Sequence, residues 1–260
     1  MSQAKKVFTR MCLNNWGGID HKVLEFHEYV NLFSGKSGSG KSTVMDAIQV
    51  ILYGSFSPSF LNKAADDAKN RRSVLSYLRG EQKDGSANRK DCDFCSVIAL
   101  EIEDTGTHII TCIGIAFEVR KSDSEIKKFV YFSHSGKMPE SEYLTEQGVC
   151  YSNQEIKKLV SARTKSDDNR GKGEVNRIYG SKEAYLGTLY DVILGYIDQN
   201  RFITMEKSAI ALKMTNGTGQ FIRDYMFPKN TSNTIATISE QLDSYRQIKD
   251  KIEDLRKRIE

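Results

Sequence analysis

The chain has 260 residues, 39% of them hydrophobic and 28% charged, and only 3 prolines, which excludes a fibrous or disordered protein and fits one large or two small domains. Its net charge of +4 does not by itself indicate a nucleic-acid-binding protein. The sequence holds no run of 18 apolar residues and no apolar signal core after Met1, so we expect a cytoplasmic protein with no membrane partner.

Short strands are expected in the first 34 residues, where they lead into a glycine-rich loop. Residues 7–14 and 22–26 have strand-like patterns on either side of a turn at 16–18. Residues 29–33 form an apolar run directly before Gly35. A buried strand that feeds a glycine loop is the setting that a P-loop requires.

The glycine-rich loop fills every position of the P-loop pattern. Its residues are Gly35, Lys36, Ser37, Gly38, Ser39, Gly40, Lys41 and Ser42, and Thr43 follows them. Glycines allow the backbone to curl so that consecutive N–H groups point at phosphate oxygens. We therefore predict that ATP and Mg²⁺ bind here, with the catalytic Lys41 at the β- and γ-phosphates, Ser42 on Mg²⁺ and Thr43 near the α-phosphate.

A helix is expected over residues 41–53, because its apolar residues recur every three or four positions and Gly54 stands where a C-terminal cap belongs. The dipole and the free amides at its N-terminus would add to the phosphate site. Basic residues are in excess between 69 and 90. Among them Arg71, Arg72 and Arg79 are candidates for contact with DNA phosphates, and a solvated loop is the alternative.

Residues 95–134 predict a three-stranded antiparallel β arm. Apolar residues alternate with a period of two over 98–102 and 109–119, and a hairpin turn is expected at 104–106. A third strand is expected at 128–134. This pattern argues against a further βαβ unit after the loop.

A helical lobe is expected over residues 153–228. Its helices are predicted to begin near 153, to cover 183–194 and to cover 220–227, with a polar, exposed loop at 164–176.

The last segment has the pattern of a coiled coil. Apolar residues from Ile235 to Ile259 step by three or four positions, with charges of both signs between them. An amphipathic surface helix is the alternative. Because the pattern has no cap at Glu260, we expect a longer native protein. We therefore divide the chain into a head lobe at 1–231 and the start of a coiled coil at 232–260.

Hydrolysis of ATP also needs an acidic residue on a second strand to hold Mg²⁺. No apolar run of four residues ends in Asp-Glu in this sequence, and Ile102-Glu103-Asp104 comes nearest, at an expected hairpin tip. We therefore expect the catalytic acid to lie outside this chain.

These features together resemble the N-terminal half of an SMC-type ATPase head, in particular the MukB-like branch with the JetC-type subunits of Wadjet plasmid-defence systems. The segments that carry the resemblance are Arg10 to Trp16, the P-loop with Met45 to Gln49, Tyr77 to Glu81, and Phe221 to Pro228. The fold that it implies is an α/β head lobe of the ABC/SMC type, with a mixed sheet on the P-loop helix, an antiparallel β arm, a helical lobe and the start of a coiled coil.

The resemblance implies an ATPase that works only as part of a complete head, so that the isolated chain would be inactive. The implied partners are the C-terminal half of the same protein with its signature and Walker B motifs, a second head in a homodimer, a kleisin-type subunit, winged-helix dimer subunits and double-stranded DNA. In Wadjet systems a topoisomerase-related nuclease is a further partner. Engagement and release of the heads would extrude DNA loops at the nucleoid, as a defence against plasmids.

The resemblance also suggests residues near the nucleotide. Gln199 is the one glutamine well placed to be the Q-loop residue that touches Mg²⁺ and the attacking water, and a plain surface glutamine is the alternative. Trp16 either packs near the adenine or belongs to the core. Arg10 and Asn14 are similar candidates for nucleotide contact.

Three other functions compete with this one. The first is a DNA-repair ATPase of the Rad50 or SbcC type. The second is an independent P-loop kinase or GTPase, which would need alternating βαβ units after the loop. The third is a scaffold that binds nucleotide without hydrolysing it.

Overall fold

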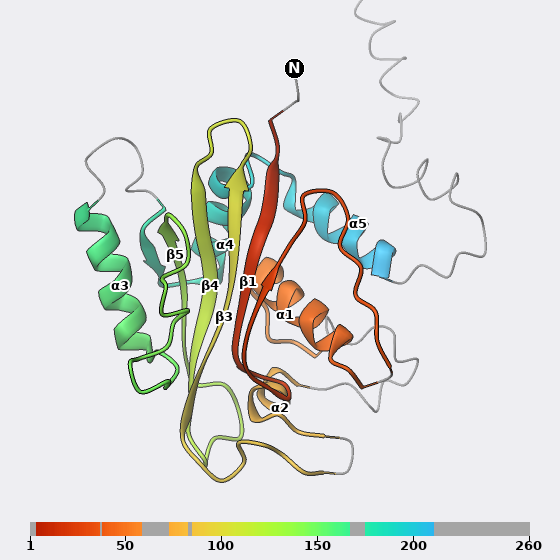
Figure 1. Cartoon of the computed structure of the whole chain (residues 1–260), viewed down its shortest axis with the longest axis vertical. Helices are drawn as coiled ribbons and strands as arrows, with labels where there is room; N and C mark the ends of the chain where they lie inside the picture. The colour runs from red at the N-terminus through yellow and green to blue at the C-terminus, as the bar shows by residue number, and fades with distance from the viewer. Residues whose placement is uncertain (1–3, 37, 59–72, 83–84, 167–174, 211–260) are drawn as a thin grey trace, which may run out of the picture. The chain divides into compact units, whose positions relative to one another are not determined.

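An antiparallel sheet of six strands, in the order β2-β1-β3-β4-β5-β6, forms the centre of the described part of the chain (Figure 1). The computed structural model describes residues 4–36, 38–58, 73–82, 85–166 and 175–210, with only the backbone of 166 and 207–210. The strands are β1 Lys6–Trp16, β2 Ile19–Glu25, β3 Phe94–Asp104, β4 Ile110–Val119, β5 Lys128–Ser135 and β6 Arg177–Tyr179. The helices are α1 Lys41–Tyr53, α2 Val74–Arg79, α3 Asn153–Ser166, α4 Lys182–Gly187, the π-helix η2 Thr188–Ile193 and α5 Gln199–Ile210.

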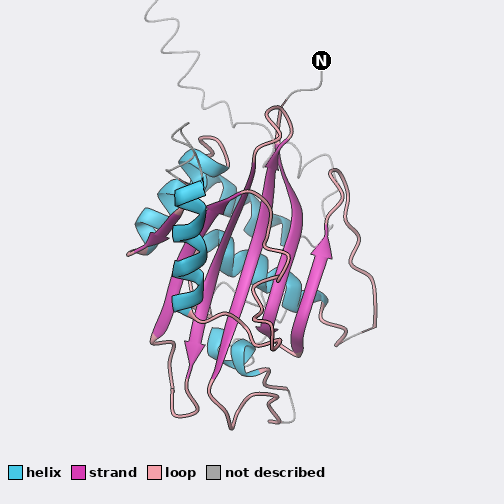
Figure 2. Cartoon of the chain, turned by 60° about the vertical axis from the view of Figure 1, so that its left-hand side comes forward, coloured by secondary structure: helices cyan, strands magenta, loops and turns pink. Residues whose placement is uncertain are grey.

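Helices cover both faces of this sheet (Figures 1 and 2). The P-loop helix α1 packs on β3 and β4, and α2 and α4 lie on the same face. Helix α3 packs on β5 and β4 from the opposite face. None of the described helices is both long and apolar enough to span a bilayer.

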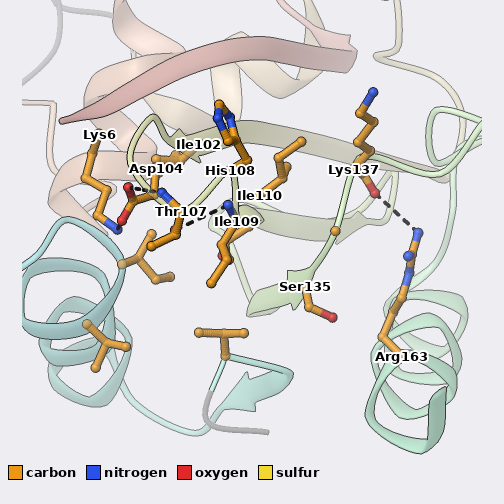
Figure 3. A pocket seen from close by; sticks show the side chains of 15 residues that line it. Lys6, Ile102, Asp104, Thr107, His108, Ile109, Ile110, Ser135, Lys137 and Arg163 are labelled. Atoms are coloured by element: carbon orange, nitrogen blue, oxygen red, sulfur yellow. Dashed lines mark hydrogen bonds and ion pairs between the residues drawn. The ribbon is translucent and has the colours of Figure 1, made fainter. Parts of the chain in front are cut away.

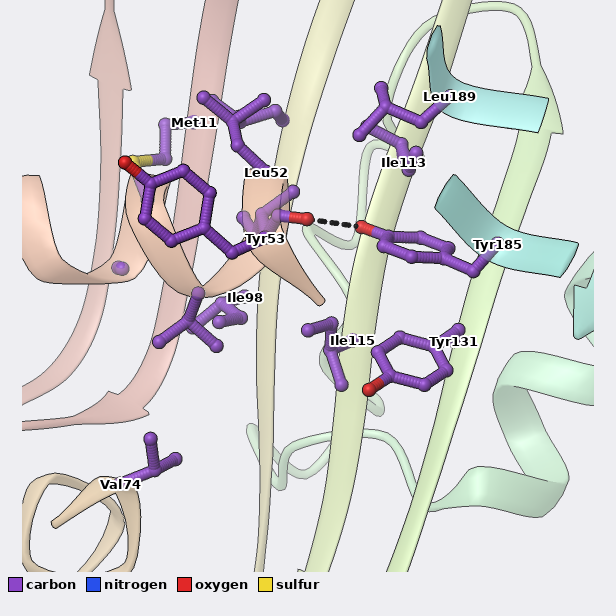
Figure 4. Close-up of a cluster of buried hydrophobic side chains, with 14 of the residues drawn as sticks. Met11, Leu52, Tyr53, Val74, Ile98, Ile113, Ile115, Tyr131, Tyr185 and Leu189 are labelled. Atoms are coloured by element: carbon purple, nitrogen blue, oxygen red, sulfur yellow. Dashed lines mark hydrogen bonds between the residues drawn. The ribbon is translucent and has the colours of Figure 1, made fainter. Parts of the chain in front are cut away.

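Two hydrophobic clusters follow from the alternation of side chains along the strands. In β3, Ile98, Leu100 and Ile102 belong to the cluster around α1, whereas Val97 and Ala99 belong to the cluster under α3. Figure 4 shows the first cluster, where Met11, Ile98 and Ile113 meet side chains of α1 and α4. The predicted period of two and the consecutive antiparallel order of β3, β4 and β5 are therefore confirmed.

The helix predicted over 41–53 is also confirmed, with the bounds Lys41–Tyr53. Gly54 ends it in the left-handed conformation at φ 52°, which glycine adopts without the steric cost of a Cβ atom.

The α/β class and the antiparallel arm are as expected, but the arm is joined to the rest of the sheet. Strand β1 pairs antiparallel with β2 on one edge and with β3 on the other, so the described sheet is antiparallel and not mixed. The pairing between β1 and β3 is long, running from Lys6 opposite Asp104 to Asn14 opposite Val97. Sequence periodicity identifies the strands but does not say which strand pairs with which.

The strand expected at 29–33 does not form in this chain. Three of its apolar side chains are exposed, with 70% of Tyr29, 77% of Val30 and 88% of Leu32 accessible to solvent, whereas Phe33 is half-buried against the core. An extended apolar segment becomes a strand only where a neighbour pairs with its backbone, and none of the described strands does so.

The helix expected over 183–194 is divided into α4 and the π-helix η2. In η2, the Leu194 N–H donates to the carbonyl oxygen of Leu189, five residues earlier, at 2.8 Å. The helix expected at 220–227, the domain boundary at 231 and the coiled coil at 232–260 lie outside the described residues, as does most of the polar loop at 164–176.

Candidate nucleotide-binding site

The loop before α1 has the backbone of a phosphate-binding turn. Gly35, Gly38 and Gly40 have φ values of 152°, 84° and 91°, a region in which residues with a Cβ atom are strained. At Gly35 a Cβ atom would also lie 2.6 Å from Ser39 Oγ, so the turn requires glycine for space as well. Ser37 lies outside the described residues.

The ammonium group of Lys41 is held against the loop. Lys41 Nζ donates to the carbonyl oxygens of Gly35 at 2.6 Å and Lys36 at 2.9 Å, and to Ser39 Oγ at 3.3 Å. The structure therefore places a cation beside the inner edge of the turn, where phosphate oxygens bind in a P-loop.

The first turn of α1 presents backbone donors to the same place. The first intrahelical hydrogen bond runs from the Val44 N–H to the carbonyl oxygen of Gly40, so the amides of Lys41, Ser42 and Thr43 precede the ladder. Gly40 supplies no side-chain cap, and the first turn carries no acidic residue. An uncapped helix N-terminus next to a cation is suited to an anion.

These residues fit a nucleoside triphosphate with Mg²⁺. The exposed hydroxyl of Ser42 is the kind of hard oxygen ligand that Mg²⁺ takes. Lys41 and the amides of the first turn are donors for phosphate oxygens. The structure thus brings the described residues of the predicted loop together at one end of α1.

Trp16 is a core residue in this structure. Its side chain is fully buried, and its indole N–H donates to the carbonyl oxygen of Thr43 at 2.9 Å. The ring stacks on Tyr77. Trp16 therefore has no exposed surface for direct contact with adenine, and the alternative of a core tryptophan holds.

The nucleotide contacts suggested for Arg10 and Asn14 stay predictions, and in this structure both side chains contact Glu142. Both alternate along β1 with Met11 and Leu13, which face α1, and so they lie on the opposite face of the sheet. Arg10 forms an ion pair with Glu142 at 3.0 Å, and Asn14 Nδ2 donates to the carbonyl oxygen of Glu142 at 2.8 Å.

Gln199 begins helix α5, and Arg79 ends helix α2. Gln199 is the first residue of α5 and is half-buried, so its assignment to a Q-loop stays a prediction. Arg79 Nη2 donates to the carbonyl oxygens of Lys121 at 3.1 Å and Asp123 at 2.5 Å, which gives it a role in holding the β4–β5 loop. Arg71 and Arg72 lie outside the described residues.

The acidic residues of Ile102-Glu103-Asp104 are at the β3–β4 hairpin, as expected, and are paired there. Lys6 Nζ donates to Asp104 at 2.6 Å, and this bond, with hydrogen bonds from the N–H groups of Gly106 and Thr107, lowers the pKa of Asp104 to about 2. Glu103 pairs with His108 at 2.9 Å.

A cavity of about 600 Å³ adjoins this hairpin, with Lys6 and Asp104 on one side and Lys137 and Arg163 on the other (Figure 3). Lys6 begins β1, whereas Trp16 ends it beside α1. A strand of 11 residues spans about 33 Å. The cavity is therefore separate from the P-loop.

Sequence reasoning missed the side chains that fasten α1. Tyr77 donates a hydrogen bond to Asp46 on the first half of α1. At the other end, Tyr131, Tyr185 and Tyr190 bond carbonyl oxygens of its last turn and of Gly54 just beyond it. The only signal in the sequence is that these tyrosines sit at apolar positions, where a buried hydroxyl needs a partner.

Comparisons with known proteins support the identification of a P-loop in this chain. Residues 8–68 match the family model described as the P-loop containing region of AAA domain. Over 74 residues the chain is 34% identical to the SbcC subunit of the nuclease SbcCD from Staphylococcus haemolyticus (strain JCSC1435). This segment is 27% of the chain and 6% of that relative, so the chain spans a small part of the relative's length.

Two solved structures share a partial likeness with the chain. The first has a TM-score of 0.33 and 16% identity, and the match covers 61% of this chain and 80% of that one. It is described as "Structural biochemistry of ATP-driven dimerization and DNA stimulated activation of SMC ATPases". "Structure of the recombination mediator protein RecF-ATP in RecFOR pathway" has a TM-score of 0.32 and 14% identity, covering 81% and 45%. Such TM-scores do not define a common fold.

Proposed function

We propose that this chain is the ATP-binding N-terminal part of an SMC-type ATPase head. The observation that carries the proposal is the P-loop: the Lys41 ammonium lies against the turn, and the uncapped first turn of α1 opens beside it. In the bound state Lys41 would neutralise the β- and γ-phosphates, Thr43 would contact the α-phosphate and the Ser42 hydroxyl would hold Mg²⁺.

Hydrolysis in this proposal needs a second polypeptide segment. The sequence contains no apolar run ending in Asp-Glu that could supply the acid for Mg²⁺. The extended residues 29–33, which run into the P-loop, expose Tyr29, Val30 and Leu32 without pairing to any described strand. A strand of the C-terminal half, paired here, would cover this apolar segment and bring the acid beside Ser42.

The wider assembly belongs to the same proposal. Two heads would form a homodimer around ATP, with a kleisin-type subunit, winged-helix subunits and double-stranded DNA as partners, in the cytoplasm at the nucleoid. In the MukB-like branch with JetC-type subunits the motor would extrude DNA loops and, with a topoisomerase-related nuclease, act against plasmids. Arg71, Arg72 and Arg79 remain the candidates for contact with DNA.

A second candidate is a DNA-repair ATPase of the SbcC type. The 34% identity with the SbcC protein favours it, although only 74 residues align. The two candidates share the P-loop chemistry and differ in the DNA that is handled. A defence motor would be stimulated by closed circular DNA, whereas a repair ATPase would respond to linear DNA with free ends.

ATP hydrolysis tests the proposal, first with this chain alone and then with a C-terminal head fragment supplied in trans. We expect no turnover alone, turnover after complementation, and its loss in Lys41→Ala. Robust turnover by the isolated chain would replace the split head with a self-contained P-loop enzyme. Repeating the complemented assay with closed circular and linear DNA distinguishes the defence motor from the repair ATPase.

A further inference from the structure

The P-loop helix α1 is fastened at both ends, but by different groups. At its first turn, Trp16 Nε1 donates to the carbonyl oxygen of Thr43 at 2.9 Å. At its last turn, the hydroxyls of Tyr185 and Tyr190 donate to the carbonyl oxygens of Ile51 at 2.9 Å and Leu52 at 3.0 Å. The first of these attachments lies within the turn that would hold phosphate.

A local change of backbone direction aims Trp16 at α1. Strict alternation along β1 would place Trp16 on the same face as Asn14, away from the P-loop. Asn15 instead adopts φ 56°, in the left-handed region, and its Nδ2 donates to the carbonyl oxygen of Cys95 at 2.7 Å. Trp16 consequently joins Leu13 in the cluster under α1. Strain of this kind persists only where surrounding contacts impose it.

The indole is itself held in place. It lies parallel to the Tyr77 ring, with centroids 5.0 Å apart. The Tyr77 hydroxyl donates to the carboxylate of Asp46 on α1, and the Tyr77 carbonyl oxygen accepts the Gly17 N–H at 2.8 Å. These contacts orient the indole N–H that meets Thr43.

We propose that Trp16 is a positioning residue for the nucleotide site, because its indole N–H sets the orientation of the first turn that carries Lys41, Ser42 and Thr43. This inference rests on the proposed function, since it assumes that the turn binds the phosphates of ATP. Phosphate binding by a P-loop depends on placement of amides and cation, so a small rotation of the turn weakens several contacts together. The last turn of α1 lies about 13 Å away along the helix axis and has no such effect.

Two variants separate positioning from stability. Trp16→Phe keeps an aromatic ring against Tyr77 but removes the N–H donor. The Thr43 carbonyl oxygen is not orphaned, since its second lone pair faces the helix ladder. Tyr190→Phe is the matched control, because it also removes one buried side-chain donor to a carbonyl oxygen of α1, but at the last turn.

The experiment measures the Kd of MgATP by calorimetry and the Tm of the full 260-residue chain for wild type and both variants. We expect Kd to rise roughly threefold to tenfold in Trp16→Phe, the effect of one lost hydrogen bond. Tyr190→Phe should leave Kd unchanged. It should lower Tm by about as much as Trp16→Phe does, at about 2–4 °C for each 1 kcal/mol lost.

Equal Kd values in wild type and Trp16→Phe would overturn this inference and leave the proposed function intact. A wild-type chain that does not bind MgATP would instead remove the proposed function itself. Should Trp16→Phe fail to fold, replacing the only tryptophan with benzothienylalanine removes the N–H at constant shape. The control is a chain with 5-fluorotryptophan, which keeps the N–H. We expect the benzothienylalanine chain to bind MgATP more weakly than this control, and equal binding would overturn the inference.

Discussion

The indole ring of Trp16 lies parallel to the phenol ring of Tyr77, with an interplanar angle of 5°. Trp16 is the only tryptophan in the chain and is fully buried. The protein thus carries a single fluorophore of this kind, bonded to the first turn of the P-loop helix. This arrangement gives an intrinsic signal for events at the nucleotide site.

We expect MgATP to change the emission of Trp16 in a saturable way, because the phosphate charge would come to the turn whose carbonyl oxygen the indole contacts. Acrylamide should quench the free protein weakly, since the ring is buried. A fluorescence titration measures both, with Lys41→Ala as the control that should show no nucleotide response. A response of equal size in Lys41→Ala would contradict the assignment of the signal to the P-loop.

Arg89 is a buried cation that joins the β1–β2 turn to α2. Its Nε donates to the Leu78 carbonyl oxygen at 2.9 Å, its Nη2 to that of Gly17, and its Nη1 to Asp20 at 2.8 Å. Burial lowers the pKa of Arg89. We expect Arg89→Met to lower the free energy of unfolding by about 2–4 kcal/mol, because it leaves two carbonyl oxygens without their donor.

The matched control for Arg89 is Asp20→Asn, which removes only the exposed partner. The Asp20 side chain is 80% accessible, so its loss should cost about 1 kcal/mol or less. Urea unfolding measures both variants. Equal losses in the two would mean that the ion pair, rather than the carbonyl contacts, gives Arg89 its effect.

Local patterns in the sequence are sufficient to predict several elements of the structure. Helix α1 follows from apolar spacing and from Gly54, and both are local signals. The meander of β3 to β5 follows from a period of two that both faces of the sheet enforce. The P-loop follows from a spacing that is itself the chemical requirement.

Other features depend on partners that are distant in sequence. The resemblance suggests nucleotide contacts for Arg10 and Asn14, but a sequence does not state which face of a strand meets the P-loop helix. Their actual partner, Glu142, is more than 120 positions away. The segment at 29–33 has a strand's composition, but it lacks a described neighbour to pair with. Pairing, and not propensity, decides such cases.

His134 should make stability depend on pH. It is fully buried, its Nδ1–H donates to the carbonyl oxygen of Ser135 at 3.0 Å, and its Nε2 lies 2.9 Å from the Tyr143 hydroxyl. Burial lowers the pKa of His134 to about 4. Between pH 6.5 and 4 the unfolded chain therefore binds a proton that the folded protein does not, and stability falls as pH falls through this window.

At 1.36 kcal/mol for each pKa unit, the wild type should lose about 2–3 kcal/mol between pH 7.5 and pH 4.5 through this group. His134→Phe should be less stable at pH 7.5, because Ser135 and Tyr143 lose a partner, but it should lack this part of the pH dependence. Urea unfolding at the two pH values gives the comparison. Parallel losses in wild type and variant would assign the pH dependence to other groups.

Gly17 touches the first turn of α1 where a larger residue would not fit. Its φ is 59°, and a Cβ atom there would lie 2.6 Å from Cγ2 of Thr43. Gly17→Ala should therefore destabilise the protein by about 1–3 kcal/mol, through the left-handed backbone and the collision together. Gly18→Ala is the matched control, since no atom lies within 4 Å of its Cβ position and its φ is not positive, and it should be nearly neutral.

A double-mutant cycle divides the effect of Gly17→Ala into its two causes. Thr43→Ser removes Cγ2 and keeps the hydroxyl, so Gly17→Ala should cost less in that background by about 0.5–1 kcal/mol. The part that remains is the backbone cost of a Cβ atom at positive φ. Thermal unfolding measures all four proteins. Strict additivity of the two substitutions would show that a Cβ atom at position 17 does not collide with Thr43, and that the contacts of Trp16 and Tyr77 position α1 instead.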